Sequence, residues 1–345
     1  MLRVVIPLLH GGYACTAVTP IEVFKSAGVI WNLLHGEKPE PCFEVVTVTA
    51  DGKPVHADTN LSLTPQTSAA EVSTPDLIFI PAGGLTLDVV TRNGYDIDAV
   101  AKPNAAIIPH IARWASEGAQ VAGACAGVSL VAMAGLLDGR IATAHWGLAH
   151  LYKARFPKVD WRPELLLTDA GGIYCGGGVN AASDLALYLV EKFFGRDVAA
   201  KTARALLIEM PRPWQAAFSD LAPNIQEGDP SIGRALAWLH QNFARDVQND
   251  ALAEMVGMSP RTFSRRFKGA TGQTPLTYLH SVRISAAKRL LENERRTVQD
   301  VMKQVGYEDA IFFRNLFKRH TGEAPAAYRE RFAGMRINTR RENAA

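Results

Sequence analysis

Apolar positions in residues 1–207 follow two alternating patterns. Short, nearly continuous apolar runs indicate buried strands, and longer stretches with apolar residues three or four apart indicate helices. Strands that alternate with helices favour a mostly parallel sheet with helices on both faces, so we expect an α/β, flavodoxin-like domain at 1–207. The pattern predicts strands at 4–9, 43–49, 77–81 and 120–125, and helices at 20–34 (with Pro20 in the first turn), 107–117, 126–137 and 185–194.

The pattern changes beyond this domain. Residues 208–230 hold four prolines and show no clear period, which predicts an interdomain linker. Every later segment has helical spacing, so an all-α domain is expected at 231–333 and a tail at 334–345. The helices expected in this domain are 249–256, 261–270, 275–291, 297–305 and 309–320.

A motif of 16 residues occurs twice in the helical domain. It reads F-x-x-x-F-K-x-x-T-G-x-x-P-x-x-Y, begins at Phe263 and recurs at Phe313, with seven of the 16 positions identical. A fixed offset indicates one supersecondary unit used twice. Each unit combines a short helix, a turn and a basic second helix, so the sequence predicts two helix-turn-helix units.

The net charge of +3 is unevenly distributed along the chain. Residues 1–230 contain 17 Lys and Arg against 23 Asp and Glu, a net charge of −6, whereas residues 231–345 contain 20 against 11, a net charge of +9. A basic domain attached to an acidic one favours a polyanion as the partner of the basic domain alone. The expected polyanion is double-stranded DNA.

Cysteine usage and hydropathy exclude other classes of protein. The chain has no run of about 18 uncharged apolar residues, so we expect no transmembrane helix and no membrane partner. The four cysteines lie far apart and form no CxxC motif. We expect reduced thiols, a cytoplasmic location, no metal site and no cofactor.

Several strings in the helical domain are specific to a known family. They are MSPRTFSRRFK from Met258, TGQTP from Thr271, VGYED from Val305 and FRNLFKRHTG from Phe313. With these strings, residues 231–333 resemble the tandem helix-turn-helix domain of the AraC/XylS transcription regulators. The resemblance covers the whole predicted domain and implies sequence-specific DNA binding.

The resemblance also implies which side chains face DNA. The second helix of such a unit enters the major groove, where Arg pairs with guanine and Asn with adenine. Arg261, Ser264 and Arg265 are the base-reading candidates of the first unit, and the second unit has two apolar residues and Asn315 on the equivalent face. The family commonly has a basic residue at the Asn315 position, so we expect the first unit to supply most sequence discrimination and the second mostly affinity. The candidate DNA-binding residues are Arg261, Thr262, Ser264, Arg265, Lys268, Ile311, Phe312, Arg314, Asn315, Lys318 and Arg319.

The most specific local feature of the α/β domain is the string GACAG at Gly123–Gly127, between a predicted strand and a predicted helix. It has the form of a nucleophile elbow, with Cys125 in place of serine. A thiol at a helix N-terminus feels the positive end of the helix dipole, which predicts a lowered Cys125 pKa. Backbone N–H groups here and at 83–84 are suited to hold an anion or a carbonyl oxygen. His145 is the candidate partner of the thiol.

Further strings extend the elbow into a second resemblance. TPIEVF from Thr19, LIFIPAGG from Leu77 and GLLDGRIATAHW from Gly135 resemble the ThiJ/PfpI class of the glutamine-amidotransferase-like superfamily. Regulators that fuse such a domain to an AraC-type domain use it as a sensor, often of amino acids or quaternary amines. The candidate ligand-binding residues are Gly83, Gly84, Cys125, Ala126, His145 and Trp146.

Catalysis is not expected in this domain. Many ThiJ/PfpI enzymes keep an acidic residue a few positions before the Pro-Ile-Glu string, but residues 13–18 contain no carboxylate. A nucleophile without an orienting acid makes a weak catalytic site. We therefore expect no catalytic residue, and Cys125 and His145 are vestigial candidates.

These features predict a sequence-specific DNA-binding transcriptional regulator that is not an enzyme. Its N-terminal domain is expected to sense a small metabolite, amino-acid-like or amine-like, and to dimerise. The expected partners are double-stranded DNA, the small-molecule effector, a second copy of the chain and RNA polymerase. The alternative is a cysteine-dependent amidase or deglycase-like hydrolase fused to a DNA-binding domain.

Overall fold

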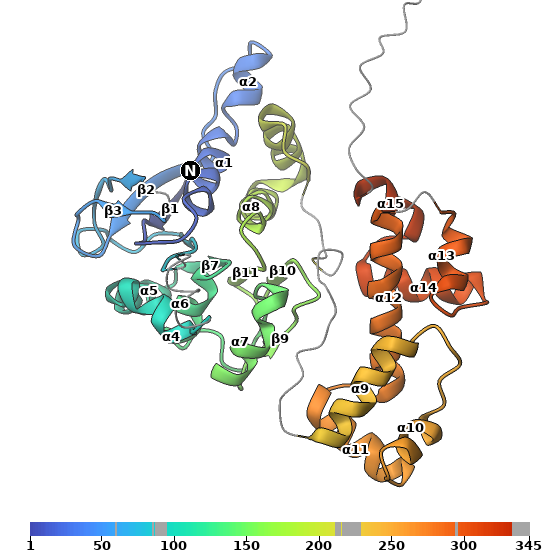
Figure 1. Ribbon diagram of the computed structural model, residues 1–345. Coiled ribbons are helices and arrows are strands. Elements are labelled where there is room, and N and C mark those ends of the chain that lie inside the picture. Colours follow the sequence, from blue (N-terminus) through green and yellow to red (C-terminus); the bar gives the residue numbers. More distant parts are fainter. Residues whose placement is uncertain are drawn as a thin grey trace, which may run out of the picture. The chain divides into compact units, whose positions relative to one another are not determined.

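The computed structural model (Figure 1) describes residues 1–58, 61–84, 86, 95–210, 215, 229–293 and 296–332. The chain divides into two compact units, Met1–Ala216 and Ala217–Ala345. Most of the expected linker at 208–230 and the whole tail at 334–345 lie outside the described residues. Among the helices that are described, none is long and apolar enough to cross a membrane.

The first unit is built on a seven-stranded sheet with the order β10-β11-β7-β6-β1-β2-β5. All neighbouring strands are parallel except β10 and β11, which pair antiparallel. The expected mostly parallel sheet is therefore confirmed. Its strands are β1 (Leu2–Pro7), β2 (Phe43–Thr49), β5 (Thr67–Ser68), β6 (Leu77–Ile80), β7 (Gln120–Ala124), β10 (Leu167–Asp169) and β11 (Ile173–Gly176), and two small sheets pair β3 (Val55–His56) with β4 (Ser62–Leu63) and β8 (Ile141–Ala142) with β9 (Asp160–Trp161).

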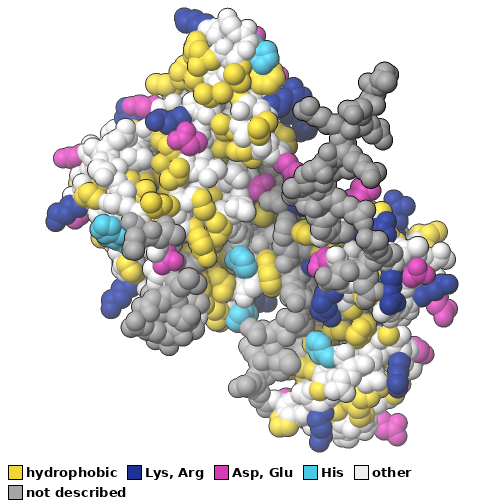
Figure 2. Space-filling model, turned by 45° about the horizontal axis from the view of Figure 1, so that its top comes forward, with side chains coloured by type: hydrophobic (Ala, Val, Ile, Leu, Met, Phe, Trp, Pro, Cys, Tyr) yellow, Lys and Arg dark blue, Asp and Glu magenta, His cyan; other side chains and the backbone are white. Residues whose placement is uncertain are grey.

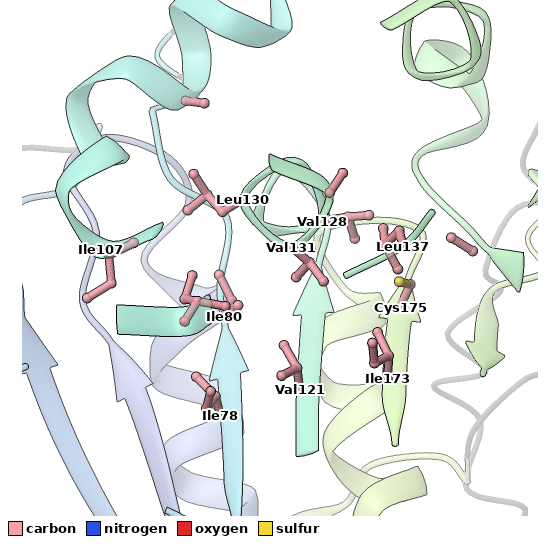
Figure 3. Packing of buried hydrophobic residues seen from close by; sticks show 14 of the residues in the cluster. Ile78, Ile80, Ile107, Val121, Val128, Leu130, Val131, Leu137, Ile173 and Cys175 are labelled. Atoms are coloured by element: carbon pink, nitrogen blue, oxygen red, sulfur yellow. The ribbon is translucent and has the colours of Figure 1, made fainter. Parts of the chain in front are cut away.

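Successive side chains of the central strands alternate between the two faces of the sheet. Ile78 and Ile80 belong to a core cluster beneath α5 (Ile108–Ser116) and α6 (Gly127–Met133), where Figure 3 shows them packed with Val121 and Val131. Phe79, between them, joins a second cluster under α1 (Cys15–Ser26) and α8 (Ala181–Leu206). Because both faces are covered, these strands read as continuous apolar runs. The other helices among the described residues of this unit are α2 (Ile30–Leu34), α4 (Ile97–Ala101), η1 (Lys102–Ile107), η2 (Trp146–Leu148) and α7 (Ala149–Arg155).

Two helices differ from the sequence prediction. The single helix expected at 20–34 is divided into α1 and α2 at Gly28, where φ is +74° and a Cβ would lie 2.0 Å from the Glu40 carbonyl oxygen. Pro20 lies inside α1 and not in its first turn, because α1 already begins at Cys15. The helix predicted to stop at Gly195 does break there, with φ +85° and ψ +165°, but a second helical segment follows up to Leu206.

Every regular element among the described residues of the second unit is a helix, as expected. Each helix-turn-helix has its own core cluster, around Phe263 and Phe267 in the first and around Phe313 and Phe317 in the second. The long helix α12 contributes to both clusters and connects the first helix-turn-helix to the second. The helices are α9 (Pro230–Asn242), α10 (Asn249–Met255), α11 (Pro260–Thr271), α12 (Pro275–Asn293), α13 (Val298–Gln304), α14 (Ala310–Thr321) and α15 (Pro325–Phe332).

Candidate DNA interface and candidate ligand site

The first helix-turn-helix consists of α10, a turn at Gly257 (φ +72°) and α11. Ser259 caps α11 by accepting a hydrogen bond from the Thr262 N–H at 3.4 Å, and Pro260 occupies the first helical position. The faces of α11 that lie away from the core carry Arg261 and Arg265, both exposed. The cap and the core together therefore present arginines from the first turns of α11 to solvent.

The predicted basic contacts of both units are exposed. Among the described residues, they form no ion pair, whereas the neighbouring Arg266 is held by Asp229 at 2.7 Å. Figure 2 shows Lys and Arg side chains that stand out from the surface among acidic and hydrophobic ones. Unpaired cations on a recognition helix are available to phosphates and base edges. The exposed basic residues are Arg261, Arg265, Lys268, Arg314, Lys318 and Arg319.

Thr262 and Ser264, the candidate DNA-binding residues of α11 with hydroxyl groups, form hydrogen bonds within the protein. The Ser264 hydroxyl accepts from Asn249 Nδ2 at 3.4 Å, and the Thr262 hydroxyl accepts from the Ser259 hydroxyl at 3.0 Å. Both side chains are half-buried, in contrast to the arginines beside them. They are thus held in place next to the exposed arginines.

The second helix-turn-helix differs from the first at its turn. Two residues lie between Gly306 and Asp309, the N-cap residue of α14, whereas one lies between Gly257 and Ser259, the N-cap residue of α11, so the second turn is one residue longer. Asp309 accepts hydrogen bonds from the N–H groups of the first turn of α14 at 2.8 and 3.0 Å. Tyr307 lies in the longer turn and contributes to the packing around α14.

The two apolar residues at the start of α14, Ile311 and Phe312, have different surroundings. Phe312 lies with its ring centroid 5.8 Å from His280 and 5.9 Å from Tyr307, and 46% of it is exposed. Ile311 is 75% exposed and Asn315 is also exposed. Part of the Phe312 ring is therefore used in packing, and Ile311 is the apolar side chain freer to reach a base.

The elbow in the first unit has the strained backbone that its sequence predicts. Cys125 lies between β7 and α6 with φ +53°, and its N–H donates to the Gly176 carbonyl at 2.9 Å. A Cβ at Gly127 would lie 2.4 Å from the Pro81 carbonyl oxygen, and one at Gly123 would lie 2.9 Å from a Val131 methyl. The flanking glycines therefore let α6 pack directly against the ends of β6 and β7.

The prediction of a lowered Cys125 pKa is wrong. Burial raises the pKa of this thiol to about 11, because the side chain is 5% exposed and lies among Ala82, Val100 and Ala126. Removing the thiolate from water outweighs the dipole of α6, which is only seven residues long. Cys125 is therefore a protonated thiol at neutral pH.

His145 is not arranged as the base of a dyad. Its Nδ1 accepts from the Gly147 N–H at 3.2 Å, and its ring stacks on Trp146 with centroids 5.3 Å apart. Burial lowers the His145 pKa, so the ring is neutral. Within the part of the chain that the structure describes, no hydrogen bond joins His145 to Cys125.

Thr16 lies in the stretch 13–18, which contains no carboxylate. This residue is fully buried at the start of α1, and its hydroxyl donates to the Tyr13 carbonyl at 2.7 Å. The same hydroxyl accepts from the Ala82 N–H at 3.0 Å. The Thr16 hydroxyl thus links the loop at Tyr13 to the loop at Ala82.

The backbone donors proposed for a ligand are partly used by the protein itself. The Gly84 N–H donates to the His10 carbonyl at 2.6 Å, and a Cβ at Gly84 would lie 1.6 Å from the Val100 carbonyl oxygen. The expectation that the Gly84 N–H is available to a ligand is therefore corrected by its bond to His10.

Two tyrosines near Cys125 were not predicted. Tyr95 packs against the Cys125 cluster and against the core cluster that contains the buried Tyr152. Burial raises the Tyr95 pKa to about 12. No local pattern relates Tyr95 to an elbow that lies 30 residues further along the chain, so only the fold brings them together.

Known proteins resemble this chain over both of its units. The helix-turn-helix domain family matches residues 252–331. The HTH-type transcriptional regulator GlxA of Rhizobium meliloti is 26% identical over 301 residues, which are 87% of this chain and 88% of that one. The HTH-type transcriptional regulator CdhR of Pseudomonas aeruginosa is 24% identical over 320 residues, which are 92% and 89% of the two chains. The solved structure of an AraC family transcriptional regulator from Pseudomonas putida is 22% identical with a TM-score of 0.46 and covers 60% of this chain and 100% of that one.

Proposed function

We propose that the chain is a sequence-specific DNA-binding transcriptional regulator of the AraC/XylS type, and that its N-terminal domain binds a small metabolite without converting it. The observation that carries this proposal is the state of Cys125. A cysteine nucleophile acts as a thiolate and needs a base or a lowered pKa. Here burial raises the thiol pKa to about 11 and the neutral His145 ring bonds its own turn.

The candidate ligand residues then act as the walls and donors of a binding pocket. In this proposal Gly83 and Ala126 contribute backbone polar groups to the pocket, and Cys125 contributes a small apolar surface. The stacked rings of His145 and Trp146 form an aromatic wall. Gly84 lines the same loop, with its N–H paired to His10. An amino-acid-like or amine-like effector suits a site that combines backbone polar groups with stacked aromatic rings.

In the second unit we propose that the exposed arginines of α11 read bases and that the basic residues of α14 mainly bind phosphates. Two helix-turn-helix units in one chain suit successive major grooves about one helical turn apart. Dimerisation through the N-terminal domain would bring two DNA-binding domains to one operator. If the protein activates transcription, RNA polymerase is a further partner. We propose a cytoplasmic location for the protein.

The sensor proposal is tested on the purified full-length chain. Thermal shift with a panel of amino acids, betaines and polyamines is expected to find one chemical class that raises the melting temperature. The same compounds are then expected to change affinity for a mapped operator in a gel-shift assay. Failure of every class in both assays contradicts the proposal.

The Cys125→Ala variant separates the sensor from the hydrolase alternative. If Cys125 only lines the pocket, the variant keeps the effector-dependent shift and the operator response. Turnover of an amide or glycated substrate that disappears in Cys125→Ala would instead establish the hydrolase.

A further inference from the structure

The turn Gly176–Gly178 meets three different groups in succession. The Gly176 carbonyl accepts from the Cys125 N–H, and Gly178 lies beside the His145 ring, since a Cβ there would be 3.8 Å from its Cδ2. Between them, a Cβ at Gly177 would lie 2.3 Å from Nε2 of Gln215. The missing side chain of Gly177 therefore makes room for Gln215 next to the candidate ligand site.

The Gln215 side chain is inserted into the first unit. Only 3% of this residue is exposed, although glutamine is ordinarily a surface residue. Its Nε2 lies 2.9 Å from the carbonyl oxygens of Ala144 and Leu165 and 3.1 Å from Thr143 Oγ1. The backbone N–H of Gln215 also donates to the Glu164 carbonyl at 3.1 Å.

The surroundings of Nε2 hold more acceptors than a carboxamide can use. A carboxamide nitrogen carries two hydrogens, and three oxygens face it. The Thr143 hydroxyl donates its own hydrogen to the Leu165 carbonyl at 2.7 Å, so it presents lone pairs to the site. A primary ammonium, with three hydrogens and a positive charge, matches three acceptors better than the amide does.

We propose that this three-acceptor site is the subsite for the primary ammonium or primary amide end of the effector, and that Gln215 is a built-in occupant that the effector displaces. The proposal rests on the sensor function and narrows its ligand class. A quaternary ammonium has no N–H to donate and is excluded from this subsite. In the sequence, Gln215 lies between α8, the last helix of the first unit, and α9, the first described helix of the second unit.

The test uses the full-length chain with Gln215→Ala and small probes. Propionamide reproduces the glutamine side chain beyond Cα, and propylamine replaces its amide by an ammonium. Both are expected to raise the melting temperature of Gln215→Ala in a saturable manner. The wild type must first release Gln215, so half-saturation is expected at a concentration about tenfold higher or more.

Matched probes and variants test the chemistry of the subsite. Propionate has the shape of propionamide but no donor, and tetramethylammonium has the charge but no N–H, so neither is expected to stabilise Gln215→Ala. In the Gln215→Ala background, Gly177→Ala is expected to abolish the response, because its methyl group enters the space of Nε2. Thr143→Val is expected to weaken the response, and Thr143→Ser, which keeps the hydroxyl, is expected to preserve it.

Equal responses of wild type and Gln215→Ala, or a response to propionate as large as that to propionamide, overturn the proposal. Gln215→Glu is the second variant if Gln215→Ala does not fold. Its carboxylate faces three acceptors and cannot occupy the site, so propylamine is expected to stabilise it as well. An absence of any probe response in the folded variant also overturns the proposal. These assays need neither operator nor natural effector, so the sensor function can fail in the operator assay while the subsite stands.

Discussion

Single side chains on α11 and α14 decide how the two copies of the repeat differ. Their shared residues are mostly scaffold, such as buried phenylalanines and turn glycines, with Lys268 and Lys318 as a shared candidate contact, whereas the base-reading positions diverge. Arg265 is exposed without an ion-pair partner in the described chain, and Asn315 is exposed on the equivalent face of α14. Specificity is thus a property of a few residues on a repeated scaffold.

Arg265→Ala is expected to cost about 1–3 kcal/mol of discrimination at one base pair, because Arg makes a bidentate contact to guanine. Asn315→Ala is expected to reduce affinity with a smaller change in discrimination. Gel-shift titrations on a mapped operator and its single-base variants measure both. Equal loss of discrimination in the two variants would show that the units share base reading.

Gly257 and Gly306, in the turns of the first and second helix-turn-helix, allow a matched test of how each turn contributes to stability. Both have positive φ, so alanine costs about 1–2 kcal/mol of left-handed strain at either position. At Gly306 a Cβ would also lie 2.5 Å from the Ala244 carbonyl oxygen, whereas nothing lies within 4 Å of one at Gly257. Gly306→Ala is therefore expected to lower the urea midpoint more than Gly257→Ala, measured by far-UV circular dichroism. Equal midpoints would contradict this packing.

At the scale of elements, α12 joins the two helix-turn-helix units through polar aromatic pairs. Tyr278 of α12 bonds His240 of α9 at 2.8 Å, and His280 of α12 bonds Tyr307 of the second turn at 2.7 Å. Arg283, also on α12, donates to the carbonyls of Phe243 and Arg245, each at 2.8 Å. One helix therefore holds the connection before α10 and the turn before α14 together.

These contacts predict acid sensitivity of the helical domain. Burial lowers the pKa of His240, His280 and His320 below the ordinary 6.5, with smaller effects of Arg283 on His280 and of the neighbouring His280 on His320. The unfolded chain then binds more protons than the folded one below about pH 6.5, so stability falls as the pH decreases through that range.

The melting temperature followed by far-UV circular dichroism from about pH 7.5 to about pH 5.5 measures this effect, because most carboxylates remain ionised in that window. His280→Gln is expected to flatten the pH dependence. A melting temperature that stays constant or rises on acidification would contradict the prediction.

At the scale of the whole molecule, the charge difference between the two halves directs nucleic acid to the helical domain. Operator affinity is expected to fall linearly with the logarithm of salt concentration, with a slope of about −0.9 per phosphate contact. Lys268→Ala and Lys318→Ala are each expected to reduce that slope by about 1. Lys158→Ala, a change in the first unit at a lysine paired with Asp138, is the control and should leave the slope unchanged. Equal effects of all three would place the phosphate contacts elsewhere.

Much of this protein follows from local sequence. The apolar runs predict the strands because a parallel sheet covered on both faces buries every residue of its central strands. The repeat predicts the two helix-turn-helix units because its phenylalanines, glycines and caps act within a few residues of one another. The elbow at Cys125 is equally local, since its turn depends on the small residues beside it.

What the tertiary structure decided depends on groups that are far apart in the chain. The Cys125 pKa depends on how much water the folded chain excludes, which the position of a thiol before a helix does not reveal. The pairing of the Gly84 N–H with His10 and the packing of Phe312 on His280 join distant segments. Sequence by itself determined the kind of protein, through periodicities and local turns. Only the fold decided which polar groups are hydrogen-bonded within the protein, including those around Gln215, because burial and pairing are properties of the packed chain.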